Sequence, residues 1–182
     1  MKNLLKQWSS LKLMLFSGIT VFSSDLICKN HPELVMILES GTVKIETYPD
    51  KAPKHVKRIV ELVKQGFYNN LTFHRVIKGF MAQGGDPNGD GTGGSGINIE
   101  SEFNDLKHKR GILSMARAND PNSADSQFFI CYDDLPSLDG KYTIWGKVTE
   151  GMHLIDRIPA GKGSNGQVLS NATKIITMRL QK

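Results

Sequence analysis

The most informative segment of this chain is residues 73–86, with the sequence FHRVIKGFMAQGGD. It starts with a strand-like apolar run, and in a strand alternate side chains point to the same face. Phe73, Arg75 and Ile77 are therefore expected on one face of that strand. Two more large apolar side chains and the amide of Gln83 follow within six residues. The segment thus supplies a cation, an amide and apolar surface that could line one groove.

Outside this segment, the patterning predicts a chain built mainly of short strands. Residues 34–38 and 43–46 flank a glycine-containing turn and predict a β-hairpin. Residues 51–65 carry apolar side chains at three- and four-residue steps, with Pro53 near the start and Gly66 after the end, which predicts an amphipathic helix. Further strands are predicted at 71–77, 80–83, 112–116, 128–132, 142–148 and 174–180, and a short helix at 151–158. Many strands and little helix favour an antiparallel barrel or sandwich.

The charge balance gives no reason to expect a nucleic-acid-binding protein. Lys plus Arg number 23 and Asp plus Glu 18, which gives a net charge of +5 over 182 residues. Three of these positive charges lie in the first 23 residues, which contain no acid, so residues 24–182 carry only +2 (5 − 3). A body with so small an excess gives no charge signal for nucleic-acid binding, so the basic pI says little about such a partner. We therefore expect one domain, residues 33–182, without a nucleic-acid partner.

The N-terminal residues 1–24 have the layout of a secretory signal peptide. Three lysines precede a short apolar run at 13–22, and small residues follow at Ser23 and Ser24. The run is too short for a membrane-spanning helix, which needs about 20 residues. We predict export to the periplasm or outside the cell, a linker at 25–32, and no membrane association of the mature form. The alternative is an N-terminal extension on a cytoplasmic protein.

Two motifs in the chain resemble ligand sites without meeting their requirements. Residues 89–94, GDGTGG, fit the dinucleotide pattern G-x-G-x-x-G, but no helix-forming sequence follows. Residues 86–91 fit the first half of a calcium loop, but the twelfth position is Ile97 instead of a glutamate. Cys28 and Cys131 are too few for a metal site or a disulfide framework. We expect a glycine-rich loop beside a groove, a buried Cys131, and no metal or cofactor.

Five segments together resemble the cyclophilin family of peptidyl-prolyl cis-trans isomerases, and most of all its bacterial branch. They are FHRVIKGFMAQGGD at 73–86, GTGG at 91–94, GILSMA at 111–116, SQFFI at 126–130 and LDGKY at 138–142. They follow the family's order, and the resemblance covers residues 33–182. It implies a mainly β fold, a closed eight-stranded antiparallel β-barrel capped by two α-helices. It also implies a substrate groove on the outside of the barrel and no cofactor.

The same resemblance assigns roles to individual positions. Arg75 matches the family's catalytic arginine, and Gln83 matches the glutamine that orients it. The positions that match walls of the proline pocket are Phe80, Met81, Phe129 and Leu138, with Tyr142 as a further aromatic wall. The positions that match the groove lining or the peptide-backbone contacts are His74, Gly91, Ala116, Arg117, Ala118 and Gln127. For His74, a scaffolding role and direct substrate contact both stay open.

Three departures from eukaryotic family members bear on ligands. Ser137 stands where many of them have tryptophan, so weak or no cyclosporin binding is expected. Tyr142 replaces a histidine, which keeps an aromatic wall with a polar tip. Arg117 replaces an asparagine, so side-chain contacts there are expected to differ while backbone contacts persist. Residues 119–126 also form a loop one residue longer.

The resemblance predicts an isomerase that accelerates rotation about X–Pro bonds, without covalent chemistry, in unfolded or exported polypeptides. A second hypothesis is a proline-segment binding module or holdase chaperone in which turnover is secondary. A third, a nucleotide- or calcium-dependent protein, depends only on the loop at 86–94. Nothing in the sequence predicts an obligate partner, so we expect a monomer.

Overall fold

The dominant element of the computed structural model, which describes residues 31–182, is one curved antiparallel sheet of eight strands. The strands are β1 (Glu33–Leu38), β2 (Gly41–Thr47), β3 (Arg75–Ile77), β4 (Met81–Gly84), β5 (Ile112–Met115), β6 (Phe128–Cys131), β7 (Ile144–Glu150) and β8 (Ile175–Leu180). The helices are α1 (Pro53–Lys64), α2 (Met152–Asp156) and the 3-10 turn η1 (Pro136–Leu138). The predicted signal peptide, most of the predicted linker and Cys28 lie outside the described residues.

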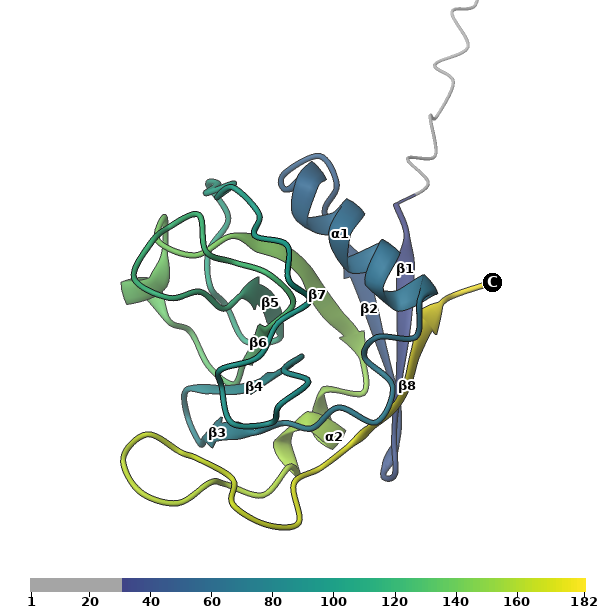
Figure 1. Ribbon diagram of the computed structural model, residues 1–182, viewed down its shortest axis with the longest axis vertical. Helices are drawn as coiled ribbons and strands as arrows, with labels where there is room; N and C mark the ends of the chain where they lie inside the picture. The colour runs from purple at the N-terminus through teal and green to yellow at the C-terminus, as the bar shows by residue number, and fades with distance from the viewer. Residues whose placement is uncertain (1–30) are drawn as a thin grey trace, which may run out of the picture.

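The sheet confirms the expected barrel class, with one correction to the way in which the barrel closes. Its strand order is β3-β4-β6-β5-β7-β2-β1-β8, and every pair is antiparallel. The edge strands β3 and β8 share no ladder. Instead, the chain preceding β3 meets the chain entering β8 through a bridge between Thr72 and Lys174 and through the Phe73 N–H, which donates to the Thr173 carbonyl at 3.0 Å. Figure 1 shows β1, β2 and β8 on one side and β3–β6 on the other.

Helix α1 forms where the sequence predicted it, but a distant residue caps its start. Pro53 occupies the first turn, where a missing N–H costs nothing, and Gly66 follows the end with a φ of 71°. The N-cap residue, Ala52, makes no side-chain cap. Instead, the carboxylate of Glu102 accepts hydrogen bonds from the backbone N–H groups of Lys54 and His55, each at 3.0 Å. An anion at a helix N-terminus satisfies free donors and complements the helix dipole.

Two apolar clusters lie on opposite faces of the central strands. Along β6, Phe128 and Ile130 point into the barrel interior, while Phe129 and Cys131 point to the other face. The interior cluster also takes the apolar face of α1 and the fully buried Trp145. Because β6 is buried on both faces, its sequence is a continuous apolar run, although alternate side chains point to opposite faces. The second, outer cluster is the base of the candidate site.

One predicted face is wrong. Phe73 is fully buried in the interior cluster, together with Val76. Ile77 packs against the outer cluster, and Arg75 lines the pocket described below. The reason is that β3 begins only at Arg75, so residues 71–74 do not follow strand alternation. The remaining elements begin and end within two residues of the predicted limits.

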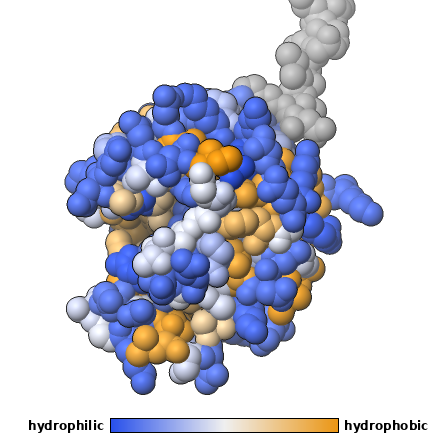
Figure 2. Space-filling view, in the orientation of Figure 1, coloured by the Kyte–Doolittle hydropathy of each residue, from blue (hydrophilic) through white to orange (hydrophobic). Residues whose placement is uncertain are grey.

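The surface of the described residues is largely polar. Figure 2 shows one face on which hydrophilic side chains surround small hydrophobic patches. Four large apolar side chains in residues 31–182 are exposed: Ile97, Phe103, Leu169 and Ile176. Within the same range, neither helix has the length and apolar character that crossing a bilayer demands.

Candidate active site

Arg75 is held beside the groove by partners from two distant parts of the chain. The β3–β4 pairing places Arg75 directly opposite Gln83. The Nη1 group donates to the Gln83 side-chain oxygen at 3.1 Å, and Nε donates to the backbone carbonyl of Asn165 at 2.8 Å. Two acceptors at different edges of a planar guanidinium fix its orientation. Asn165 was not predicted, because it lies 90 residues away and contributes only a backbone oxygen.

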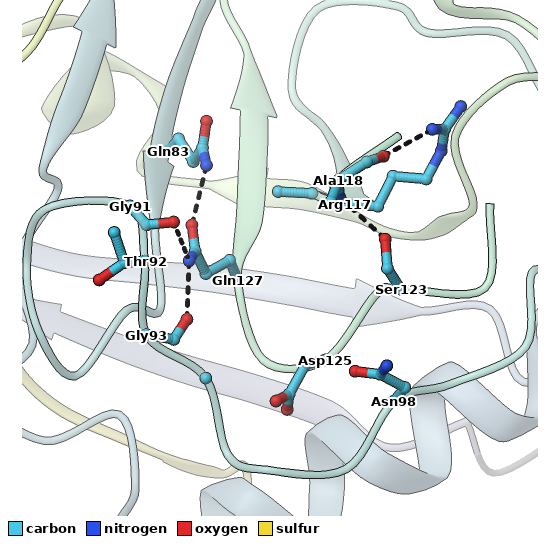
Figure 3. A pocket seen from close by; sticks show the side chains of 12 residues that line it. Gln83, Gly91, Thr92, Gly93, Asn98, Arg117, Ala118, Ser123, Asp125 and Gln127 are labelled. Carbon is cyan, nitrogen blue, oxygen red and sulfur yellow. Dashed lines mark hydrogen bonds between the residues drawn. The ribbon is translucent and has the colours of Figure 1, made fainter. Parts of the chain in front are cut away.

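A hydrogen-bonded chain of side-chain amides continues from Arg75 to the glycine-rich loop, and Figure 3 shows its part from Gln83 to the loop. The Gln83 amide nitrogen donates to the Gln127 side-chain oxygen at 2.9 Å. The Gln127 nitrogen in turn donates to the carbonyls of Gly91 and Gly93, at 3.0 and 2.8 Å. Both ends of the Gln127 amide are therefore engaged within the protein. Its geometry suits a residue that positions Gln83 and Arg75.

The glycine-rich loop is organised by the carboxylate of Asp86, which is buried. Asp86 accepts hydrogen bonds from the backbone N–H groups of Asn88, Asp90 and Gly91, at 2.9, 3.0 and 2.5 Å. At Gly93, a β-carbon would lie 2.2 Å from an Asp86 oxygen, so only glycine fits. The residues that resembled a calcium loop thus serve to fold the loop. Among the described residues, no cluster of three His, Cys, Asp or Glu side chains could hold a metal.

The outer apolar cluster opens into a small pocket of about 100 Å³. Phe129 lies at its base, and its ring makes an edge-to-face contact with Tyr142, with centroids 5.6 Å apart. The Arg117 guanidinium lies over the Tyr142 ring at 4.8 Å. The pocket is lined by Arg75, Phe80, Met81, Gln83, Ala116, Arg117, Phe129, Leu138 and Tyr142. A cation beside an apolar slot is the arrangement that the sequence suggested.

A second, more polar pocket of about 300 Å³ adjoins the first, and the two share Gln83, Ala116 and Arg117. Of the predicted groove residues, it includes Gly91, Ala118 and Gln127. Its lining also includes residues that were not predicted: Thr92, Gly93, Gly94, Asn98, Ser123 and Asp125. These come from two irregular loops, where neither alternation nor helical spacing marks a common face. Together the two pockets form one continuous groove.

His74 lies apart from this groove. It is 3% exposed and lines neither pocket, although its Nε2 is 3.9 Å from the position that a β-carbon on Gly91 would take. Burial lowers the pKa of His74, so the ring is neutral near pH 7. Of the two roles left open by the sequence, the structure favours scaffolding beneath the loop.

Comparisons with known proteins agree with this fold. Residues 34–180 match the family model for cyclophilin type peptidyl-prolyl cis-trans isomerases. The chain is 41% identical over 187 residues, 95% of each chain, to a probable peptidyl-prolyl cis-trans isomerase of Brucella abortus. It is 48% identical over 136 residues, 72% of this chain and 83% of the relative, to a peptidyl-prolyl cis-trans isomerase of Helicobacter pylori. A Cryptosporidium parvum cyclophilin solved in the presence of the dipeptide Ala-Pro has a TM-score of 0.75 and 36% identity, and the match covers 82% of this chain and 99% of that one.

The structure thus combines an antiparallel barrel with a groove in which a cation lies beside an apolar slot. The chain belongs to the cyclophilin family. It is a peptidyl-prolyl cis-trans isomerase, which accelerates rotation about X–Pro bonds in protein folding.

Proposed function

We propose that isomerisation takes place in the pocket lined by Arg75 and Phe129, with Arg75 as the catalytic residue. The observation that carries this proposal is the guanidinium, which is held by the Gln83 side chain and the Asn165 carbonyl at the edge of an apolar slot. Arg75 lines the slot that has room for a proline ring, so its charge is available to a substrate seated there.

The chemistry of rotation explains why a guanidinium helps. The planar X–Pro amide resists twisting with a barrier of roughly 18–20 kcal/mol, because resonance is lost as it rotates. In the twisted state the prolyl nitrogen regains a lone pair that can accept a hydrogen bond. A donor placed beside that nitrogen binds the twisted state better than either planar state, which lowers the barrier. Arginine stays protonated and keeps this donor available at all relevant pH values.

The other groove residues divide into those that hold substrate and those that position Arg75. Phe80, Met81, Phe129, Leu138 and Tyr142 supply the apolar walls for the proline ring. A lower local dielectric there strengthens the bond from the guanidinium. The second pocket, which begins at Ala116 and Ala118, receives residues that flank the proline. Gln83 and Gln127 fix the guanidinium through their chain of amides.

The substrates we propose are proline-containing segments of unfolded or exported chains. The Ala-Pro dipeptide present with the Cryptosporidium parvum relative supports a proline-containing ligand. Ser137, which is exposed in η1 beside the pocket wall Leu138, supports weak cyclosporin binding, since a small polar side chain offers little surface to a large apolar ligand. The N-terminal sequence supports a periplasmic or secreted location.

The test is the exchange rate of a short X–Pro peptide with wild type, Arg75→Ala and a matched control, Arg110→Ala. Arg110 is exposed, pairs with Asp156 and lines neither pocket. Arg75→Ala is expected to lose at least tenfold in kcat/KM with its fold intact, and Arg110→Ala to stay within twofold. Equal rates for wild type and Arg75→Ala would reject the mechanism.

The same variant separates an isomerase from a binding module. If turnover is the function, Arg75→Ala loses catalysis of refolding for a protein limited by proline isomerisation, while peptide affinity changes little. If holding is the function, suppression of aggregation persists in Arg75→Ala and accounts for the whole effect on refolding.

A further inference from the structure

A buried histidine that is not among the groove residues supports two walls of the proline pocket from behind. The His108 side chain is fully buried, and its ring stacks on Phe129, with centroids 6.1 Å apart and 14° between the planes. Phe129 pairs with Ser114 across β5 and β6, and the Ser114 hydroxyl lies 3.1 Å from His108 Nε2. The position of the Phe129 ring therefore depends on a ring that is itself anchored to the neighbouring strand.

His108 also holds both ends of η1, the turn that carries the pocket wall Leu138. Its carbonyl accepts from the N–H of Leu135, immediately before η1, at 2.7 Å. Its backbone N–H and its ring Nδ1 both face one carboxylate oxygen of Asp139, immediately after Leu138, at 2.8 and 3.0 Å. Three contacts thus fasten η1 to a single residue, and through it to Phe129.

The protonation of this cluster follows from its partners. The backbone hydrogen bond from His108 lowers the pKa of Asp139 to about 2, so the carboxylate is ionised near neutrality. Burial lowers the pKa of His108, which leaves the ring neutral there. A carboxylate opposite Nδ1 requires the single proton at Nδ1. The unprotonated Nε2 then faces the oxygen of the Ser114 hydroxyl, which donates its own proton to the Thr143 carbonyl at 2.9 Å. Lys107 pairs with the other Asp139 oxygen at 3.4 Å, so the carboxylate keeps a counter-ion on its exposed side.

We propose that His108 and Asp139 are positioning residues for isomerisation, which set the geometry of Phe129 and Leu138 without touching substrate. This inference rests on the proposed function, because it takes those two side chains as walls of the proline pocket. A displacement of either wall would move the proline ring relative to the Arg75 guanidinium. Loss of well-defined geometry at a reacting group costs rate even when the residue that is changed lies outside the site.

The chain offers a matched control in a second buried histidine–carboxylate pair. The His55 side chain is also fully buried, and its Nδ1 lies 2.6 Å from Glu102, a carboxylate of similar exposure to that of Asp139 (12% against 18%). His55 lies on α1 and lines neither pocket. His108→Gln and His55→Gln each remove one buried ring with its carboxylate contact. Only the first removes a contact with Phe129.

The experiment compares these two variants at a temperature where thermal melts show both to be folded. His108→Gln is expected to lose about tenfold in kcat/KM on an X–Pro peptide, and NMR spectra of labelled phenylalanine are expected to show a shifted or broadened Phe129 ring. His55→Gln is expected to stay within twofold of wild type, with an unchanged Phe129 signal. If the two variants lose the same activity, or if His108→Gln keeps full activity, the inference is wrong.

A second pair of variants, at Asp139, keeps the inference testable if His108→Gln fails to fold. Asp139→Asn retains an oxygen that can accept from His108, whereas Asp139→Ala does not. We expect Asp139→Asn to recover most of the activity that Asp139→Ala loses, and equal activity in the two would overturn the inference. Arg75→Ala, measured in parallel, separates a failure of the proposed function from a failure of the positioning role. An active Arg75→Ala contradicts the proposed function, while an inactive one beside a fully active His108→Gln contradicts only the positioning role.

Discussion

Replacing Gln83 by leucine tests whether the chain of amides positions the catalytic group. Leucine has a similar volume but offers no oxygen to the Arg75 Nη1 group and no nitrogen to Gln127. The guanidinium would keep its bond to the Asn165 carbonyl and its longer contact with the Met81 sulfur at 4.0 Å, and it would lose the oxygen acceptor that β4 provides. We therefore expect Arg75 to remain in the groove but to rotate about the remaining bond.

The size of the effect follows from the bond that is lost. A hydrogen bond to a charged group contributes about 1.5–3 kcal/mol. Arg75 is partly exposed and water can replace some of that energy, so we take the lower end of the range. Since each 1.4 kcal/mol is a factor of ten in rate, Gln83→Leu should lower kcat/KM about tenfold. Gln127→Leu removes a contact one step further from Arg75 and should cost less, about threefold.

The assay is exchange of an X–Pro peptide under conditions where binding and turnover can be separated. The loss in Gln83→Leu should appear mainly in kcat, because the apolar walls that grip proline are unchanged. Activity equal to wild type, or a loss larger in Gln127→Leu than in Gln83→Leu, would refute a positioning role for this chain of amides.

Other predictions concern stability, the loop and ligand choice. Glu102→Ala should lower the free energy of unfolding by about 2 kcal/mol, measured by denaturant titration, because it uncaps α1 and leaves His55 without its carboxylate. Burial lowers the pKa of the three buried histidines, His55, His74 and His108, so below pH 6.5 the unfolded chain binds more protons than the folded one. The free energy of unfolding should therefore fall on acidification, by at most about 4 kcal/mol per pH unit. A constant melting temperature between pH 7 and 5 would contradict this. Gly93→Ala should lower both kcat/KM and the melting temperature, because its β-carbon collides with the loop's buried carboxylate. Ser137→Trp should raise cyclosporin affinity over wild type in a calorimetric titration, by adding apolar surface beside the pocket.

Local patterning was enough to predict most of the elements. Helix α1 was predictable because Pro53 and Gly66 mark its ends and its apolar residues recur with helical spacing. The strands were predictable as short apolar runs between glycines. Their order in the sheet was not, because neighbouring strands such as β4 and β6 are far apart in the chain. The closed barrel was expected from the family resemblance. The one correction is that the barrel closes through residues that flank β3 and β8 and not through a ladder between these strands.

The candidate site was predictable where side chains act and unpredictable where the backbone or remote residues act. Arg75, Gln83 and Phe129 do lie around one groove. Asn165 contributes a carbonyl oxygen, which leaves no trace in residue identity. His108 carried no signal either, because its contacts with Asp139 and Phe129 join segments that are separated by more than twenty residues.

Burial also explains why individual residues were hard to place from the sequence. His74 and Arg75 are adjacent, yet His74 is buried while Arg75 lines the pocket. Alternation does not say which face is covered. The glycine-rich loop covers His74 and leaves Arg75 open to the groove, and that loop is shaped by the buried Asp86. The role of a side chain here depends on a segment with no regular structure of its own.

The most direct test of the mechanism is the rate of isomerisation of a peptide while it is bound, measured by NMR exchange at saturating enzyme. Arg75→Lys keeps the positive charge but loses the planar donors that Gln83 and Asn165 orient. We predict that Arg75→Lys lowers the bound-state rate at least tenfold while peptide affinity stays within a few-fold of wild type. An unchanged bound-state rate would show that the oriented guanidinium does not assist the rotation.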